Sequence, residues 1–361
     1  MRKVQLVRIS EGERQTISRL AQIPTLSIAS VSPQKPDMPP IGQKYQELDS
    51  DSVATKSTSH KHSLLLRRMW RERWVYALLL PGLLYFLAFY YLPLLGNIVA
   101  FQDYSPYLGF FRSPWIGLAN FARLFTDPEI GIAIQNTLII SILQILFAFP
   151  SGIALALLLN ALISERFKRF MQSVLYLPHF LGWVIIISIW QQLFGGDGFL
   201  NHFIVGMGGK PIDIITNPDF FKPMVVLQVM WKDSGWSTII FMAAITAIDT
   251  SLYEAAVVDG ANKWRRIWHI TLPGIRGIIV LLLILRIGNI LSTGFEQIFL
   301  QRTAVGLNAS EVIDTFVYSR ALLSGDWGFA AAVALVKTVI AALLVYTANR
   351  TVKKFGEAGL Y

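Results

Sequence analysis

The stretch EAAVVDGANKWRRIWHITLP, residues 254–273, lies between two long apolar segments and decides how the rest of the chain is organised. It starts with a run of good helix formers, which Gly260 then interrupts. In a second short run, apolar residues recur at i, i+3 and i+4, the pattern of one face of an amphipathic helix: Trp264, Ile267 and Trp268. Amphipathicity alone is equally consistent with a helix that lies on the membrane surface and with a helix that docks on a partner protein.

The composition points to a polytopic membrane protein. Of the 361 residues, 53% are hydrophobic and 15% are charged, which is too apolar for an ordinary soluble domain. The chain has no cysteine, which excludes disulfides and thiolate metal sites. Its five histidines show no metal-ligand spacing, so we expect neither a metal nor a cofactor. The net charge of +9 gathers beside the ends of apolar runs, which favours membrane orientation over nucleic-acid binding as its role.

Six apolar segments reach the roughly 20 residues that a membrane-spanning helix needs. They cover residues 74–100, 134–159, 172–194, 222–248, 273–291 and 327–348. The second segment contains Pro150 and Gly152 but is too short for two spans, so we predict one kinked helix. The sequence therefore predicts an all-α domain of six transmembrane helices over residues 74–361.

The residues before the first span form two parts. Residues 1–62 are polar and punctuated by prolines, which predicts a disordered cytosolic extension. This part lacks the apolar core of a secretory signal. Residues 63–73 are basic and amphipathic and predict an elbow helix, which would contact membrane lipid.

Positive charge predicts the orientation of the spans. Lys and Arg are dense before the first span, between the second and third, between the fourth and fifth, and after the sixth, and sparse in the other loops. Because positively charged loops stay in the cytosol, both termini and the loop at 250–273 are expected there. The predicted location is therefore a membrane that the chain crosses several times, and the resemblance described next implies a bacterial inner membrane.

The fixed positions of the opening stretch resemble the EAA loop of permease subunits in binding-protein-dependent ABC importers. These positions are Glu254, Ala255, Ala256, Asp259, Gly260, Ile270, Leu272 and Pro273. The stretches at 91–103, 113–121, 294–298 and 311–318 resemble the carbohydrate permeases of the lipoprotein/oligosaccharide type.

This resemblance implies a type I ABC importer permease fold and a set of partners. The EAA loop would be a coupling helix that docks on a cytosolic ATPase subunit. The expected partners are a second, homologous permease, two ATPase subunits and an extracytoplasmic solute-binding protein. The outer loops at 102–131, 195–221 and 292–326 would contact that binding protein. The substrate would be an oligosaccharide moving into the cytoplasm.

Ionisable residues inside a span are expensive, so they are candidates for a sugar path. One face of the fourth span and one of the fifth combine such groups with amides and an aromatic ring: Gln228, Lys232, Asp233 and Trp236, and Arg286, Asn289, Thr293 and Glu296. Weaker candidates are Gln144, Trp190, Gln191 and Gln192. The alternative is that Asp233 pairs structurally with Lys337 or Arg286, and for Lys337 pairing is the favoured interpretation. The excess of cations at mid-depth mildly favours an acidic oligosaccharide such as alginate or a pectin fragment.

Other function classes have less support. The glycine-rich GMGGK at 206–210 lacks the spacing and the Ser or Thr of a P-loop, so ATP hydrolysis is expected on a partner and the chain is not predicted to be an enzyme. An ion-coupled secondary transporter is the alternative function, but it predicts internal repeats that the sequence lacks. A purely structural scaffold leaves the intramembrane charges unexplained.

Overall fold

The computed structural model describes residues 71–356 and 359–360. The predicted extension at 1–62 and most of the predicted elbow at 63–73 lie outside these residues. The chain divides into two compact units, Met1–Leu78 and Leu79–Tyr361. Only residues 71–78 of the first unit are described, and they contain the start of the first helix. Apart from the first residues of α3, all that follows concerns the second unit.

Apart from one isolated bridge between Gln102 and Trp115, the regular secondary structure of the described residues is helical. Three helices are long and apolar enough to cross a membrane, and three further bent pairs qualify if each counts as one span. The prediction of an all-α membrane domain is therefore confirmed, with six spans when the bent pairs are included.

The first two predicted spans are continuous helices. The first, with the two short helices after it, comprises α3 (Arg73–Phe86), η1 (Leu87–Tyr91), α4 (Leu92–Leu94), η2 (Leu95–Phe101), α5 (Gly109–Arg112) and α6 (Ala119–Arg123). The second comprises α7 (Pro128–Leu143), η3 (Gln144–Ala148) and α8 (Phe149–Asn160). Here η3 is a π turn in which Phe149 N–H donates to Gln144 O. This turn accommodates Pro150, which has no N–H, so the helix continues through it as predicted.

The third predicted span, 172–194, falls on a helix pair that is broken near its middle rather than on one straight helix. It comprises α9 (Glu165–Tyr176), η4 (Leu177–Phe180), α10 (Trp183–Phe194) and α11 (Phe199–Gly206). The two halves meet at 106°. Pro178 sits in the last helical turn, and Leu181 and Gly182 are extended, which ends the helix before α10 begins.

The remaining helices range in length from three to 29 residues. They are α12 (Pro218–Thr246), α13 (Thr250–Val258), α14 (Lys263–Arg266), η5 (Ile267–Thr271), α15 (Leu272–Gly274), α16 (Arg276–Gly288), α17 (Phe295–Val305), α18 (Leu307–Ser310), α19 (Ile313–Tyr318), η6 (Ser319–Leu323) and α20 (Trp327–Lys354). The fifth predicted span, 273–291, is shorter than expected, because a 60° bend precedes Arg276 and the helix ends at Gly288.

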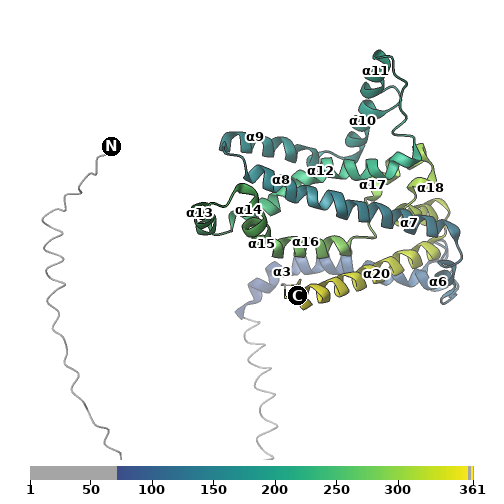
Figure 1. Cartoon of the computed structure of the whole chain (residues 1–361). Coiled ribbons are helices and arrows are strands. Elements are labelled where there is room, and N and C mark those ends of the chain that lie inside the picture. The colour runs from purple at the N-terminus through teal and green to yellow at the C-terminus, as the bar shows by residue number, and fades with distance from the viewer. Residues whose placement is uncertain (1–70, 357–358, 361) are drawn as a thin grey trace, which may run out of the picture. The chain divides into compact units, whose positions relative to one another are not determined.

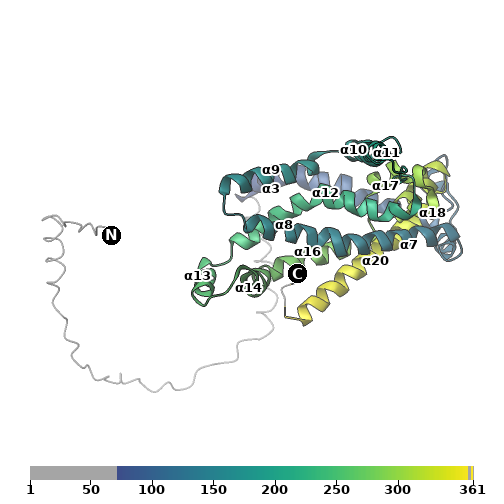
Figure 2. The same ribbon diagram turned by 45° about the horizontal axis from the view of Figure 1, so that its top comes forward.

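The long helices run side by side, and the loops gather at their two ends. Figures 1 and 2 both place α13 and α14 at one end and α18 with the start of α7 at the other. The central helix is α12, which packs against α7, α8, α9 and α17. Three apolar clusters fill the interior. Two of them include residues of α12, Phe221 with Val225 and Phe241 with Ile245. The third, which contains Phe316 and Phe329, joins α7, α19 and α20.

Two helices approach each other closely at Gly235 of α12. A Cβ atom at this position would lie 2.0 Å from the backbone oxygen of Leu175 in α9. Small residues allow such backbone contacts between helices in membranes. Gly235 therefore sets the distance between α12 and the first half of the broken third span.

Ion pairs join the loops at the end that carries α18. Arg123 contacts Asp326 at 2.6 Å, and Arg320 contacts Asp127 at 3.0 Å and Glu129 at 2.9 Å. Arg123 ends α6, Asp127 and Glu129 lie at the start of α7, Arg320 lies in η6, and Asp326 precedes α20. The contacts tie the beginning of the second span to the beginning of the sixth.

Candidate functional site

The loop between the fourth and fifth spans consists of two short helices joined by a sharp turn. The first helix, α13, starts at the N-cap Asp249, whose carboxylate accepts a hydrogen bond from Ser251 N–H at 2.9 Å. The hydrogen bonds from Ser251 hold the pKa of Asp249 below its usual value. The carboxylate thus stays ionised and complements the positive end of the helix.

Gly260 ends α13 in a left-handed conformation, with φ of +76°. Gly260 N–H donates to Val257 O at 3.1 Å, and Ala261 N–H donates to Ala256 O at 2.8 Å. This pair of hydrogen bonds is the Schellman motif, whose turning residue needs positive φ and is usually glycine. Gly260 thus interrupts the helical run where the sequence predicted, and it does so with a sharp turn between two short helices.

The second helix starts one turn later, because the side chain of Asn262 accepts a hydrogen bond from Arg265 N–H at 2.8 Å. Among the predicted loop residues, Glu254, Ala255, Asp259 and Pro273 are exposed, while Ala256, Ile270 and Leu272 are half-buried. Leu272 packs against the apolar cluster of α8 and α12. Large apolar side chains nevertheless project from the loop: Val257 and Val258, and Trp264 and Trp268.

Lys232 of α12 lies against the break in the third span. Its Nζ donates to the backbone oxygens of His179 at 2.9 Å and Leu181 at 2.5 Å, and it lies 5.4 Å from the centre of the Trp183 ring. A break in a helix leaves carbonyls without their usual donors, and in a membrane such groups must find others. Lys232 supplies these donors and is itself 9% exposed.

Three neighbouring side chains form a polar and aromatic surface beside Lys232. His179 Nδ1 lies 2.9 Å from Asp233 Oδ1, and the His179 ring stacks on Trp236 with centroids 4.5 Å apart and planes at 8°. The side chains of His179 and Asp233 are 31% and 39% exposed, and Trp236 is 44% exposed. Sequence reasoning missed His179, since its partners are distant in sequence and only Pro178 beside it marks the break.

The other predicted polar residue on this face of α12 is buried. Gln228 is 0% exposed and exchanges side-chain hydrogen bonds with Gln297 and Gln301 of α17 at 2.7–3.0 Å. These three amides hold α12 and α17 together. Gln228 and Lys232 thus contact protein in this structure, whereas Trp236 on the same face has an exposed surface.

The predicted shared face of the fifth span does not form, and that prediction is wrong. Its helix ends at Gly288, and Gly294, with φ of +93°, precedes a new helix that contains Glu296. Asn289 and Glu296 are exposed, whereas Thr293 is buried. The two glycines interrupt the helical periodicity on which the prediction depended.

The intramembrane charges find partners other than those proposed from sequence. Arg286 donates to the side-chain oxygen of Gln144, and Lys337 pairs with Asp314. Asp233 is bonded to His179, so the expected pairing of Asp233 with Lys337 or Arg286 is not what the structure has. Lys337 is paired inside the bundle, as the sequence favoured, but its partner is Asp314 rather than Asp233. Among the described residues, no carboxylate oxygen lies within 4.0 Å of the Arg286 guanidinium.

Comparison with known proteins identifies the family. Residues 148–353 match the family of binding-protein-dependent transport system inner membrane components. The chain belongs to this family. The permease is 45% identical over 312 residues to a polygalacturonan/rhamnogalacturonan transport system permease protein of Bacillus subtilis strain 168, covering 86% of this chain and 97% of the relative. It is also 45% identical to Protein LplB of the same strain, covering 81% of this chain and 92% of the relative.

Solved structures show the same fold. A bacterial ABC transporter involved in the import of the acidic polysaccharide alginate matches with a TM-score of 0.75 and 35% identity, over 80% of the permease and 98% of that chain. The alginate transporter in complex with a periplasmic protein bound to an alginate pentasaccharide matches with a TM-score of 0.76 and 34% identity, over 82% and 99%. The predicted type I ABC importer permease fold and membrane location are confirmed, and the family is one of transport proteins.

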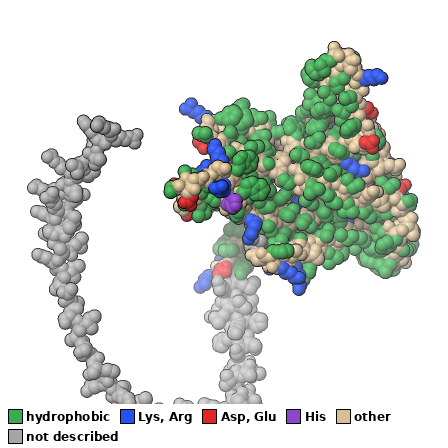
Figure 3. All heavy atoms as spheres, viewed as in Figure 1, with side chains coloured by type: hydrophobic (Ala, Val, Ile, Leu, Met, Phe, Trp, Pro, Cys, Tyr) green, Lys and Arg blue, Asp and Glu red, His purple; other side chains and the backbone are tan. Residues whose placement is uncertain are grey.

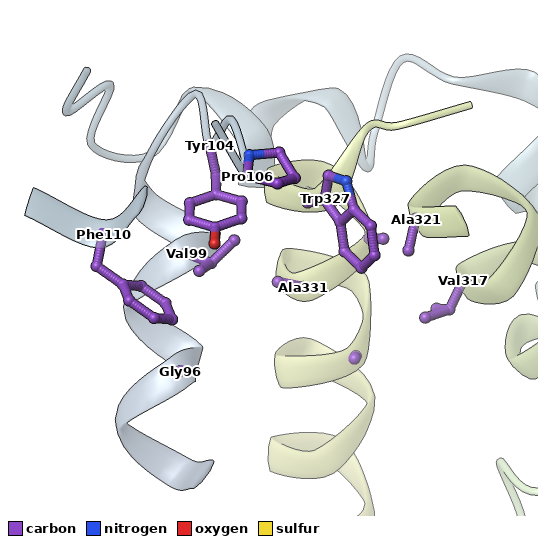
Figure 4. Close-up of a pocket in the computed structure, with 11 residues that line it drawn as sticks. Gly96, Val99, Tyr104, Pro106, Phe110, Val317, Ala321, Trp327 and Ala331 are labelled. Carbon is purple, nitrogen blue, oxygen red and sulfur yellow. The ribbon is translucent and has the colours of Figure 1, made fainter. Parts of the chain in front are cut away.

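Two pockets of the permease differ in chemistry. One of about 500 Å³ lies between α10 and the segment that leads to α12, and its lining includes Gln191, Gln192 and Asp197. The other, of about 440 Å³, lies between η2 and α20, with Tyr104 and Trp327 on its walls (Figure 4). Its lining is almost entirely apolar. The first pocket can bind sugar hydroxyls, whereas the second offers them few partners.

Replacing Lys232 by methionine is expected to lower the stability of the permease, by about 2 kcal/mol or more, since two carbonyls at the break lose their donor. Thermal unfolding of the purified complex measures this loss. Lys222→Met is the matched control, because Lys222 is a half-buried lysine near the start of the same helix. If the Lys232→Met complex has normal stability but transports poorly, Lys232 lines the sugar path instead of stabilising the break.

Proposed function

We propose that this permease moves an oligosaccharide, and preferentially an acidic one, into the cytoplasm as part of an ABC importer. The observation that carries the proposal is the coupling-loop geometry, a Schellman turn at Gly260 between two short helices with exposed apolar tips. The relatives that transport polygalacturonan and rhamnogalacturonan, and the alginate importers of the same fold, support the substrate class. An ion-coupled mechanism is not favoured, because it gives this loop no role.

The coupling loop is the proposed contact with the ATPase subunits. Val258 is 87% exposed and Trp264 is 71% exposed, and both would be buried in a cleft of a partner. Exposed Glu254 and Asp259 add charge at the same end of the bundle. ATP hydrolysis is assigned to those partner subunits.

A second permease and an extracytoplasmic binding protein complete the proposed assembly. The described part of α3 has no buried residue, so a partner permease or lipid must cover it. The loops at 102–131, 195–221 and 292–326 are assigned to the binding protein. This assignment supports an orientation with α13, α14 and both termini in the cytosol.

The proposed sugar path uses the exposed surface beside the break in the third span. Trp236 offers an aromatic face, Asp233 accepts hydrogen bonds from hydroxyls, and His179 joins the two. Charged groups at this depth are tolerated where they line an aqueous cavity. The path is extended by Arg286, Asn289 and Glu296. The buried side chains of Gln228, Lys232 and Thr293 support the helices around it.

An acidic substrate is favoured by the charges that surround this path. Lys232 and Arg286 are cationic and Asp233 is anionic, so these three side chains together carry a net positive charge. The Arg286 guanidinium donates to an uncharged amide, so a uronate carboxylate can approach it without displacing an acidic side chain. The extension at 1–62 and the elbow at 63–73 are proposed to lie outside this machinery.

Transport of a panel of neutral and acidic oligosaccharides by the reconstituted complex tests the proposal. Uptake of uronate oligosaccharides is the expected result. Trp236→Ala should weaken the apparent affinity for the sugar about tenfold, the loss of one aromatic contact, and leave assembly intact. Trp231→Ala is the control, because Trp231 lies on the same helix and is 42% exposed. Equal effects of the two variants would place the path elsewhere.

A further inference from the structure

A pocket of about 290 Å³ lies where the second span meets the coupling loop. Lys263 and Arg266 of α14 form one side of it, and Asn160, at the end of α8, lies on another. Tyr253 and Thr271 also line it, and their hydroxyls are 3.0 Å apart. The pocket therefore combines two cationic side chains with several neutral hydrogen-bonding groups.

The Arg266 guanidinium has unused hydrogen-bonding capacity. Its Nε is buried and has no hydrogen-bond partner among the described residues. No carboxylate of the described residues lies within 4.0 Å of Lys263 or Arg266. Two cationic side chains thus line the pocket with no described carboxylate beside them, so an anion with several acceptor oxygens is the ligand that it fits.

The surroundings of the pocket are those of a membrane interface. Ile163, which lines the pocket, is 92% exposed, and Trp268 nearby in the loop is 64% exposed. Tryptophan gathers at the level of lipid headgroups. Figure 3 shows Lys and Arg side chains gathered over the end that carries α13 and α14, where Arg166, Arg169 and Arg265 are also exposed. Free phosphate would use the cations but not the apolar rim.

We propose that this pocket binds the phosphate of an anionic phospholipid headgroup from the cytoplasmic leaflet, with Arg266 and Lys263 as its cationic ligands. The assignment to that leaflet rests on the orientation given under the proposed function. Because Lys263 and Arg266 belong to the second helix of the coupling loop, the bound lipid fixes that helix against the end of the second span. Cationic pockets at this face of a membrane protein attract anionic headgroups.

The test measures lipid retention by the complete transporter complex in nanodiscs. Complexes are prepared in mixtures of phosphatidylglycerol and phosphatidylcholine, and the retained lipid is counted by native mass spectrometry. Wild type is expected to retain phosphatidylglycerol over phosphatidylcholine, and Arg266→Gln to lower this preference about fivefold, the effect of one cation near the membrane surface. Arg265→Gln removes the same charge from the neighbouring residue, which does not line the pocket, and should change little.

Four further outcomes decide the proposal. Arg266→Lys keeps the charge and should retain most of the preference, which holds even where Arg266→Gln destabilises the complex. Equal losses in Arg265→Gln and Arg266→Gln would show that general surface charge retains the lipid, and would overturn the site.

Displacement of phosphatidylglycerol by inorganic phosphate would assign the pocket to free phosphate instead. Loss of the ATPase subunits from Arg266→Gln in neutral lipid would assign it to a protein carboxylate. Retention does not require transport, so failure of the proposed function would leave this result interpretable.

Discussion

Replacing Gly260 by proline is expected to abolish uptake while the permease still inserts in the membrane. Proline holds φ near −65°, whereas Gly260 has φ of +76°. It also removes the N–H that donates to Val257 O, so the Schellman turn that orients the two coupling helices is lost. Co-purification of the ATPase subunits and uptake into vesicles are the measurements, and both should fall to background.

The chain supplies a matched control for this change at Gly208. There φ is +82°, Gly208 N–H donates to Val205 O at 2.9 Å, and Gly209 N–H donates to Ile204 O at 2.9 Å. The same motif thus ends α11, away from the coupling loop. Gly208→Pro should leave the ATPase subunits bound. If Gly260→Pro took up sugar at the wild-type rate, or if both variants lost the ATPase equally, the coupling role of Gly260 would be wrong.

Gly235→Ala is expected to prevent assembly of a stable permease. The added Cβ would lie 2.0 Å from Leu175 O and 2.6 Å from Leu175 C, both of them backbone atoms that cannot rotate away. The helices must separate, which costs about 3 kcal/mol or more and also moves Lys232 away from the carbonyls that it caps. Thermal unfolding and the yield of monodisperse complex in detergent measure the effect.

Gly131→Ala is the control for this substitution. Gly131 is also inside a helix, and nothing lies within 4 Å of a Cβ built there. Alanine at such a position should be neutral or slightly stabilising, because it lowers the entropy of the unfolded chain. Normal assembly of Gly235→Ala would mean that α9 and α12 are not packed as closely as described.

Two prolines explain why the span positions could be predicted and the helix break could not. Pro150 and Pro178 both lie inside apolar segments, yet the helix continues through Pro150 and stops after Pro178. At Pro150 a local π turn is enough. At Pro178 the break leaves the carbonyls of His179 and Leu181 without helical donors. Lys232, which is 53 residues away from His179 in the chain, donates to both. A contact between distant residues leaves no periodic pattern, so the break could not be derived from the segment itself.

The candidate sites also differ in whether local sequence or distant contacts determine them. The turn at Gly260 was predictable, because glycine spacing and short-range hydrogen bonds specify it within a few residues. The polar face of α12 was identified, but which of its members are exposed depends on α17 and η4, which pack against it. The face proposed for the fifth span failed because the positive φ of Gly294 interrupts a pattern that apolar composition alone suggests is continuous.

The ion pairs at the end that carries α18 hold one end of the second span in place, so that a tilt of this helix moves mainly its other end. They join residues 191 to 203 positions apart in the chain and so anchor the start of this helix. The helix has 33 residues and is therefore about 50 Å long. A tilt of about 10° at the anchored end would carry the far end, beside the coupling loop, through roughly 9 Å. A small rearrangement at the end proposed to contact the binding protein would thereby be amplified where the ATPase is expected to dock.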